Sequence, residues 1–336
     1  MGSFDDERGG SARTQPALTS ERQLRFTLFA MFGNNTEKGT SSRRCAEQLA
    51  SLDERERREI MVQLCFDRIG QKQEYLTERF NDTTDWNETA YFMLMRSLDI
   101  GANRHTYEHL ARILPYHYLN LVRHTGRSVE ALLLGSAGLL PRLVDMCREN
   151  EAIAELKAIY DYDAHKYTLP ALTLADWQLT ALRGDNHPIV RLLQVASLIY
   201  REEHLLDAML ECRNEKDVER LFCNTDIPRW AYRFLSYESR TGAFTRTKAQ
   251  MLGINVVAQL QICYSEYTLR RDLDSRGIDL LEQLPAENNT FIRRWARMGI
   301  EAKNALESQA LLQLSKGYCT LEACDKCPFR HFMEAK

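Results

Sequence analysis

The spacing of apolar residues constrains this chain most, because these residues recur every three or four positions over most of its length. The clearest run falls on one face of a helix and contains Ile292, Trp295, Met298, Ala302, Ala305, Gln309 and Leu312. Alternating patterns, which strands need, are scarce, and the segment 243–247 is too short to count. The 336 residues also include only 16 Gly and 8 Pro, few for a fold rich in turns. We therefore predict an all-α fold.

Capping signals divide this helical pattern into separate helices. Ser51 with Glu54, and Asp85 with Glu88, have the spacing of a capping box, in which side chains satisfy the free amides of a first turn. Further helix starts are expected at Ser128, Thr173 and Asn214. The chain is therefore predicted to consist of many helices joined by short breaks.

No repeat and no low-complexity tract separates the chain into two halves. We predict one multi-helix domain over residues 45–336, within which 315–336 form a small cysteine-rich metal knuckle. Residues 1–44 are expected to be a polar, partly disordered tail, then a helix at 20–32 and a loop at 33–44.

Charge and cysteine content indicate the compartment. The net charge of −3 gives no overall attraction to nucleic acid or to an anionic membrane, so any polyanion must meet a local basic face. No apolar run approaches the roughly 18 residues that a membrane span needs, and the acidic start lacks the layout of a secretion signal. Nine cysteines, an odd number, argue against a closed disulfide framework. We expect a cytoplasmic protein with no membrane contact.

The strongest chemical signal is a group of cysteines close to the carboxyl end. Cys319, Cys324 and Cys327 have x4 and x2 spacing, and His331 follows shortly after. Thiolates are soft donors, so one interpretation is a zinc site of three cysteines and His331. An iron–sulfur cluster is a second interpretation, and free thiols without any metal are a third. In the iron–sulfur case a distant fourth donor is available from Cys212, Cys223 or Cys263.

A second candidate site surrounds the turn at 184–188, which opens an apolar helix. Arg183, Asn186 and Arg191 lie around this turn. Amides at a helix start attract anions and two arginines strengthen the attraction, so a phosphate or carboxylate site is one hypothesis. The alternative is a helix-initiating turn whose arginines pair with acidic residues.

A third candidate is the basic edge formed by Arg293, Arg294 and Arg297. Such an edge could contact the backbone of a nucleic acid. A solvated helix face is the alternative interpretation of the same run.

Motifs that would indicate an enzyme are not found. The sequence has no P-loop, GxGxxG, GxSxG or HExxH, and its carboxylates do not form a recognisable hydrolase or nuclease motif. Catalytic residues therefore remain unknown, and a binding protein is favoured over an enzyme.

Several segments in the same order resemble the uncharacterised bacterial family catalogued as domain of unknown function 2851. They are 80–88 (FNDTTDWNE), 107–114 (YEHLARIL), 130–139 (EALLLGSAGL), the Arg183–Pro188–Arg191 element, 253–257 (GINVV), 284–288 (LPAEN), 308–312 (SQALL) and the tail with Tyr318 and the three cysteines. The resemblance spans roughly residue 50 to the end. Longer members begin with a β-rich segment similar to a restriction-endonuclease core, to which the first fifty residues here show no counterpart. No active carboxylate is therefore carried over.

The resemblance implies a helical module that sits beside a nuclease-like segment in its relatives. Our leading hypothesis is a non-catalytic binding module for nucleic acid or for a nuclease-related protein partner, stabilised by the C-terminal metal. The two alternatives are a protein–protein scaffold without nucleic-acid contact and an enzyme whose site is assembled only in three dimensions.

Overall fold

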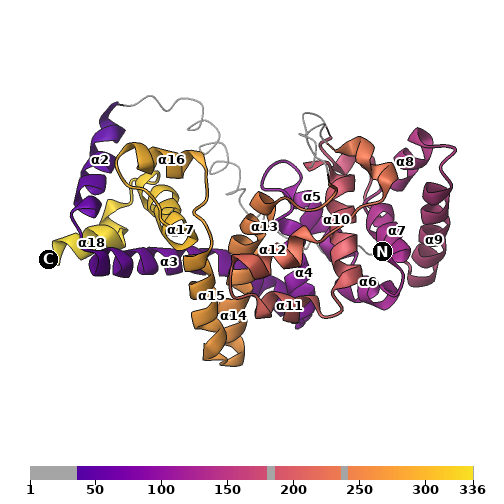
Figure 1. The fold of residues 1–336 in the computed structure, drawn as a ribbon, viewed down its shortest axis with the longest axis horizontal. Helices are drawn as coiled ribbons and strands as arrows, with labels where there is room; N and C mark the ends of the chain where they lie inside the picture. Colours follow the sequence, from indigo (N-terminus) through magenta and orange to yellow (C-terminus); the bar gives the residue numbers. More distant parts are fainter. Residues whose placement is uncertain (1–35, 180–185, 236–240, 336) are drawn as a thin grey trace, which may run out of the picture.

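The computed structural model describes residues 36–179, 186–235 and 241–335 (Figure 1). Helices joined by turns make up these residues, and no strand occurs among them, so the all-α prediction is confirmed. One hydrophobic cluster of buried side chains extends from α2 to α18, which makes the described chain a single domain. None of the helices in these ranges is long and apolar enough to cross a membrane.

The amino-terminal part of the described chain consists of α2 (Thr36–Ala50) and the long helix α3 (Glu54–Thr83). Helix α2 occupies residues for which a loop was expected, because burial of Ala46 and Leu49 in the core stabilises it. The capping box of α3 lies two residues later than predicted: Asp53 accepts a hydrogen bond from the amide of Glu56, and the Glu56 side chain accepts one from Asp53. The helix predicted at 20–32 lies outside the described residues.

The middle of the chain forms a group of shorter helices at the far end of α3 (Figure 1). In chain order they are α4 (Trp86–Arg96), α5 (Arg104–Ile113), α6 (Tyr116–Val122), α7 (Gly126–Ser136), α8 (Leu140–Met146), α9 (Glu151–Tyr167), η1 (Leu174–Asp176), α10 (Pro188–Arg201), α11 (Leu205–Glu211), α12 (Glu215–Cys223), η3 (Arg229–Phe234) and α13 (Arg246–Leu252). Asp85 and Asn214 cap α4 and α12 as predicted, whereas α7 is capped by Thr125 three residues before the expected start. The predicted capping box at Thr173 opens only the short η1 turn.

The C-terminal part of the chain packs against α3. Its elements are η4 (Gly253–Val257), α14 (Ala258–Thr268), α15 (Arg271–Gln283), α16 (Thr290–Arg297), α17 (Ala305–Gln313), η5 (Leu314–Cys319), η6 (Cys324–Lys326) and α18 (Pro328–Glu334). Helices α14 and α15 pack together as a hairpin that projects from the body (Figure 1). The ribbon places α16, α17 and α18 beside α2 and the start of α3 (Figure 1).

The continuous helix predicted from residue 292 to 312 is wrong. The chain leaves the helix after α16 and starts again at α17, with Gly299 between them at a φ of 87°. This left-handed conformation favours glycine, and it reverses the chain without the strain a side chain would add. Asn304 then caps α17 by accepting a hydrogen bond from the amide of Glu307.

Glu88 joins three helices through one buried carboxylate. It accepts hydrogen bonds from the amides of Tyr116 and His117, at 2.8 and 2.9 Å, and so satisfies the start of α6. The same carboxylate lies 4.0 Å from the buried guanidinium of Arg79 on α3. Helices α3, α4 and α6 are therefore fixed by a single acid.

We predict that Glu88→Ala strongly destabilises the fold, because it leaves Arg79 buried without its counter-ion and two amides unsatisfied. The expected loss is about 3 kcal/mol of unfolding free energy, measured from urea unfolding curves. Glu78→Ala, an exposed acid on α3, is the control and should change stability little. Equal losses in the two variants would contradict this role of Glu88.

Candidate functional site

Two cations on α3 mark the most unusual polar site among the described residues. Arg68 and Lys72 are one helical turn apart, on the side of α3 that packs against α17. The Arg68 Nε donates to Gln309 Oε1 at 2.7 Å, and the Lys72 Nζ donates to the same oxygen at 3.0 Å. Both cations are thus held against a buried amide of α17.

Two π-helical turns supply further groups to this site. The η4 turn presents Asn255, whose Oδ1 accepts a hydrogen bond from Lys72 Nζ at 2.9 Å. The η5 turn carries Lys316, and its Nζ lies 5.0 Å from the centre of the Phe291 ring. Such turns are rare and frequently occur at functional sites, because the wider backbone repositions side chains.

Arg68, Lys72, Arg104 and Lys316 form a group that we call the cation cluster. Burial, and after it the charge of Arg68, lowers the pKa of Lys72 to about 7. The pKa of Lys316 is lowered by burial and then by the charges of Arg68 and Arg104. Arg68, Lys72 and Lys316 are therefore close enough to repel one another, and Arg104 is close enough to repel Lys316.

Little negative charge offsets the cation cluster. The hydrogen bonds of Arg68, Lys72 and Arg104 go to neutral amide and carbonyl oxygens. The acid that interacts with Arg68, Lys72 and Lys316 is Glu287, which acts to raise their pKa values but is itself bonded by the side-chain amides of Asn255 and Asn289. Within the described ranges the cluster is thus left with an excess of positive charge.

One buried donor at the cation cluster also has no partner. Gln309 is 2% exposed, and while its Oε1 accepts two hydrogen bonds, its Nε2 has no partner in the described structure. A buried donor without an acceptor costs about 1–3 kcal/mol. A site with excess positive charge and a free donor is suited to bind an anion.

The predicted cysteines lie next to this site, because η5 ends at Cys319. The hydroxyl of Tyr318 donates to Asp67 of α3 at 2.9 Å, which fixes the end of η5 one residue before Arg68. Cys324 lies in η6, and Cys327 directly precedes α18. As placed, no three Cys, His, Asp or Glu side chains of the described residues form a group that could hold a metal ion. The metal site with Cys319, Cys324, Cys327 and His331 therefore stays a prediction.

The contacts of His331 lie in the same segment as Cys324 and Cys327, and its amide donates to the Cys327 carbonyl at 3.2 Å. Its Nε2 donates to the carbonyl oxygen of Asp325 at 2.8 Å, and its Nδ1 lies 3.9 Å from the carboxylate of Glu334. The side chain is 59% exposed. Cys212 and Cys263, proposed as distant donors, are buried in the helical core away from α18, and Cys223 closes α12.

The predicted anion site at 184–188 is built differently from the cation cluster. The guanidinium of Arg191 is 4% exposed and donates to Asn186 at 2.7 Å and to Gln194 at 2.9 Å. The side chain of His187 accepts from the amide of Ile189, so it caps the first turn of α10. Asn186 and Arg191 are thus brought together as an internal contact, whereas Arg183 lies outside the described residues.

The predicted basic edge is exposed on α16. Arg293 bonds only weakly to neighbouring side chains, at 3.4 Å from Asn288 and 3.3 Å from Thr290. Arg294 is exposed and lies close enough to Cys319 to lower the pKa of that thiol, against a larger increase from burial. Because Phe291 of the same helix contacts Lys316, this edge adjoins the cation cluster.

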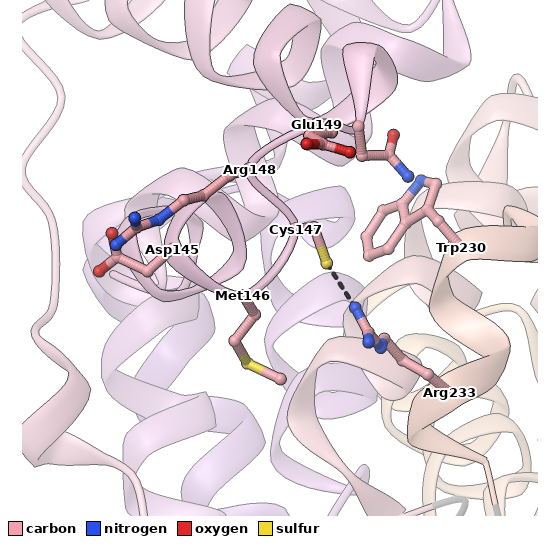
Figure 2. Close-up of a pocket in the computed structure, with 8 residues that line it drawn as sticks. Asp145, Met146, Cys147, Arg148, Glu149, Trp230 and Arg233 are labelled. Carbon is pink, nitrogen blue, oxygen red and sulfur yellow. Dashed lines mark hydrogen bonds between the residues drawn. The ribbon is translucent and has the colours of Figure 1, made fainter.

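A shallow, open pocket of about 650 Å³ lies at the other end of the molecule, between η3 and the turn after α8 (Figure 2). Arg233 points at Cys147 and donates to its sulfur at 2.7 Å, with the indole of Trp230 beside them. Asp145 and Arg148 point away from this pair (Figure 2). The pocket has one thiol and one cation facing each other, without the convergent groups of the cation cluster.

Sequence reasoning missed the cation cluster and Glu287. A usable signal existed on α3, where Leu64, Arg68, Lys72 and Leu76 are spaced by four residues and Leu64 and Leu76 are fully buried. Two cations that interrupt a buried stripe require polar partners from elsewhere in the chain. Three of the segments that resemble the bacterial family, 253–257, 284–288 and 308–312, supply Asn255, Glu287 and Gln309.

The fold and the site define a wholly helical protein with a concentrated, poorly neutralised group of cations between α3 and its C-terminal helices. The chain belongs to the family described as Protein of unknown function (DUF2851), whose model matches residues 15–290. The matched stretch includes Arg68, Lys72 and Arg104 and ends before η5 and the three C-terminal cysteines. Comparison with curated proteins and with solved structures found no match.

The lowered pKa of Lys72 predicts that the stability of the fold depends on pH. The pKa of Lys72 is about 7 in the folded chain and 10.5 as an ordinary lysine, so between these values the unfolded chain binds more protons. Unfolding free energy should therefore rise with pH across this window and fall as pH drops towards 7. Lys72→Met should lack this contribution in urea unfolding measured at several pH values. Parallel curves for the two proteins would show that Lys72 titrates normally.

Proposed function

We propose that this protein is a non-catalytic binding module that takes the phosphate backbone of a nucleic acid at the cation cluster. The observation that carries the proposal is the proximity of Arg68, Lys72, Arg104 and Lys316, which the single carboxylate of Glu287 only partly neutralises. Phosphate oxygens would supply the missing negative charge and an acceptor for the amide of Gln309. A chain with a net charge of −3 needs such a local concentration of cations to attract a polyanion.

The exposed arginines of α16 support a ligand longer than a single phosphate. Arg293 and Arg294 lie on the exposed side of the helix that carries Phe291, and the Phe291 ring covers Lys316. A basic track therefore leads from the half-buried Arg68 to the surface of α16. A strand of nucleic acid would place one phosphate in the cluster and further phosphates along this track.

We also propose that Cys319, Cys324 and Cys327 hold a metal, as Zn²⁺ or in an iron–sulfur cluster. The metal would have a structural role, because Cys319 is the last residue of the η5 turn, which also carries Lys316. A metal at the cysteines would fix η5 from one end, while the bond from Tyr318 to Asp67 fixes it to α3.

Binding should depend on the cluster and on salt. Arg68→Gln and Lys316→Gln should each weaken binding to a labelled single-stranded DNA or RNA and reduce the slope of log affinity against log salt by about 1. Fluorescence anisotropy at a series of salt concentrations measures both effects. Lys216→Gln, an exposed lysine on α12, is the matched control and should leave the slope unchanged. Loss of the same slope in Lys216→Gln, or affinity independent of salt, would reject the proposal.

A protein–protein scaffold is the second candidate, favoured by the tip of the α14–α15 hairpin. Leu269 at this tip is 85% exposed and has a φ of 58°, and Tyr267 beside it is 63% exposed. An exposed leucine in the left-handed conformation costs about 1 kcal/mol and contributes nothing to the core, so a partner protein could use it.

The scaffold hypothesis predicts association that salt does not weaken. Leu269→Asp should abolish capture of a protein partner, because it places a charge in the exposed apolar tip of the hairpin. Size-exclusion chromatography of this protein mixed with the partner protein, at low and high salt, measures the association. Capture that survives Leu269→Asp would remove the hairpin tip from consideration.

A further inference from the structure

The structure places a cysteine of α2 next to the C-terminal cysteines, although they lie at opposite ends of the described chain. Cys45 is half-buried on α2, its thiol interacts with Cys324 and Cys327, and the C-terminal end of α2 is drawn near α18 (Figure 1). Its neighbours Ala46 and Leu49 are each 1% exposed, so this part of α2 is fixed in the core. Cys45 therefore lies on a helix that is anchored in the core at the two following buried positions.

The C-terminal segment folds into two consecutive turns that contain its own three cysteines. The amide of Ala323 donates to the Tyr318 carbonyl at 3.1 Å, and Glu322 adopts a φ of 55° in this reversal. The amide of Cys327 then donates to the Cys324 carbonyl at 3.3 Å. Tight reversal of this kind is what lets cysteines with x4 and x2 spacing face one point.

The four thiols occupy one neighbourhood. Cys45 interacts electrostatically with Cys324 and Cys327, and Cys319 interacts with Cys45 and both of the others. Burial raises the pKa of the Cys327 thiol, and the amides of Arg330 and Phe329, which donate to its sulfur, offset only part of this increase. As placed, the sulfurs share a region without converging on one point, so binding of a metal requires rotation of their side chains.

We propose that Cys45 is the fourth ligand of a metal centre with Cys319, Cys324 and Cys327. The inference rests on the metal proposed above for the three C-terminal cysteines and replaces His331 with a thiolate. Four thiolates suit Zn²⁺ or an iron–sulfur cluster, which share this ligand chemistry. We favour Cys45 over His331 because the His331 side chain is 59% exposed, whereas Cys45 is half-buried and close to the other three thiols.

The surroundings fit a negatively charged centre. Four thiolates around Zn²⁺ carry a net charge of −2, and Arg44 and Arg294 both interact with these cysteines as cations. Burial raises the pKa of Cys319 to about 12, so a metal must displace protons from these thiols. The centre would join α2 directly to the end of the chain.

The test compares metal content in the full-length protein and its variants, purified without oxygen and reconstituted with Zn²⁺. Wild type should hold about one ion per chain, and Cys45→Ser should lose most of it. His331→Gln and Cys223→Ser should both keep the metal, the second as a control cysteine on α12. Cys45→His, which restores a donor, should recover binding. Visible spectra of the protein as isolated distinguish zinc, which is colourless, from an iron–sulfur cluster, which is brown.

Spectra of the Co²⁺-substituted protein count the sulfur ligands. Wild type and His331→Gln should give the same intense sulfur-to-cobalt absorption, and Cys45→His should give a weaker band from three sulfurs. Full metal content in Cys45→Ser, together with loss in Cys324→Ser, would overturn the role of Cys45 and leave the three-cysteine centre standing. A wild-type chain that takes up no metal would overturn both the role of Cys45 and the three-cysteine centre.

Discussion

Packing of α3 along α17 joins residues from the two ends of the described chain, and the candidate site depends on this contact. Apolar side chains such as Leu64 and Leu311 are fully buried in the shared core. At one end of the contact, Arg57 of α3 donates to Glu307 at 2.7 Å. Because the two helices are held in this register, Arg68 and Lys72 must face Gln309 in place of water.

Much of the fold could be predicted from local signals. Helix starts at Asp85 and Asn214 follow from a polar side chain ahead of a periodic apolar run, which is a property of a few adjacent residues. The break between α16 and α17 was missed because the apolar period continues across Gly299, and only the three-dimensional path shows that the chain reverses there. Periodicity predicts which face is buried, but it does not show whether one helix or two provide it.

The candidate site was less accessible to sequence reasoning, because Arg104 of α5, Lys316 of η5 and its other members come from separate parts of the chain. Arg68 and Lys72 belong to α3, Asn255 to η4, Glu287 to the turn before α16, and Gln309 to α17. Runs of charge such as Arg293 and Arg294 are visible in the sequence because they are adjacent. A buried cluster needs tertiary contacts, and its trace in the sequence is only the pair of cations within an apolar stripe of α3.

The η5 turn carries Lys316 of the cation cluster and, three residues later, Cys319 of the cysteine group. Two ligands that order the same short turn are thermodynamically linked. If the metal at one end raises affinity for the anion at the other, the anion raises affinity for the metal by the same factor. Gln313, which is fully buried directly before η5, limits how far the turn can shift. Through this one π-helical turn, metal binding and anion binding would thus depend on each other.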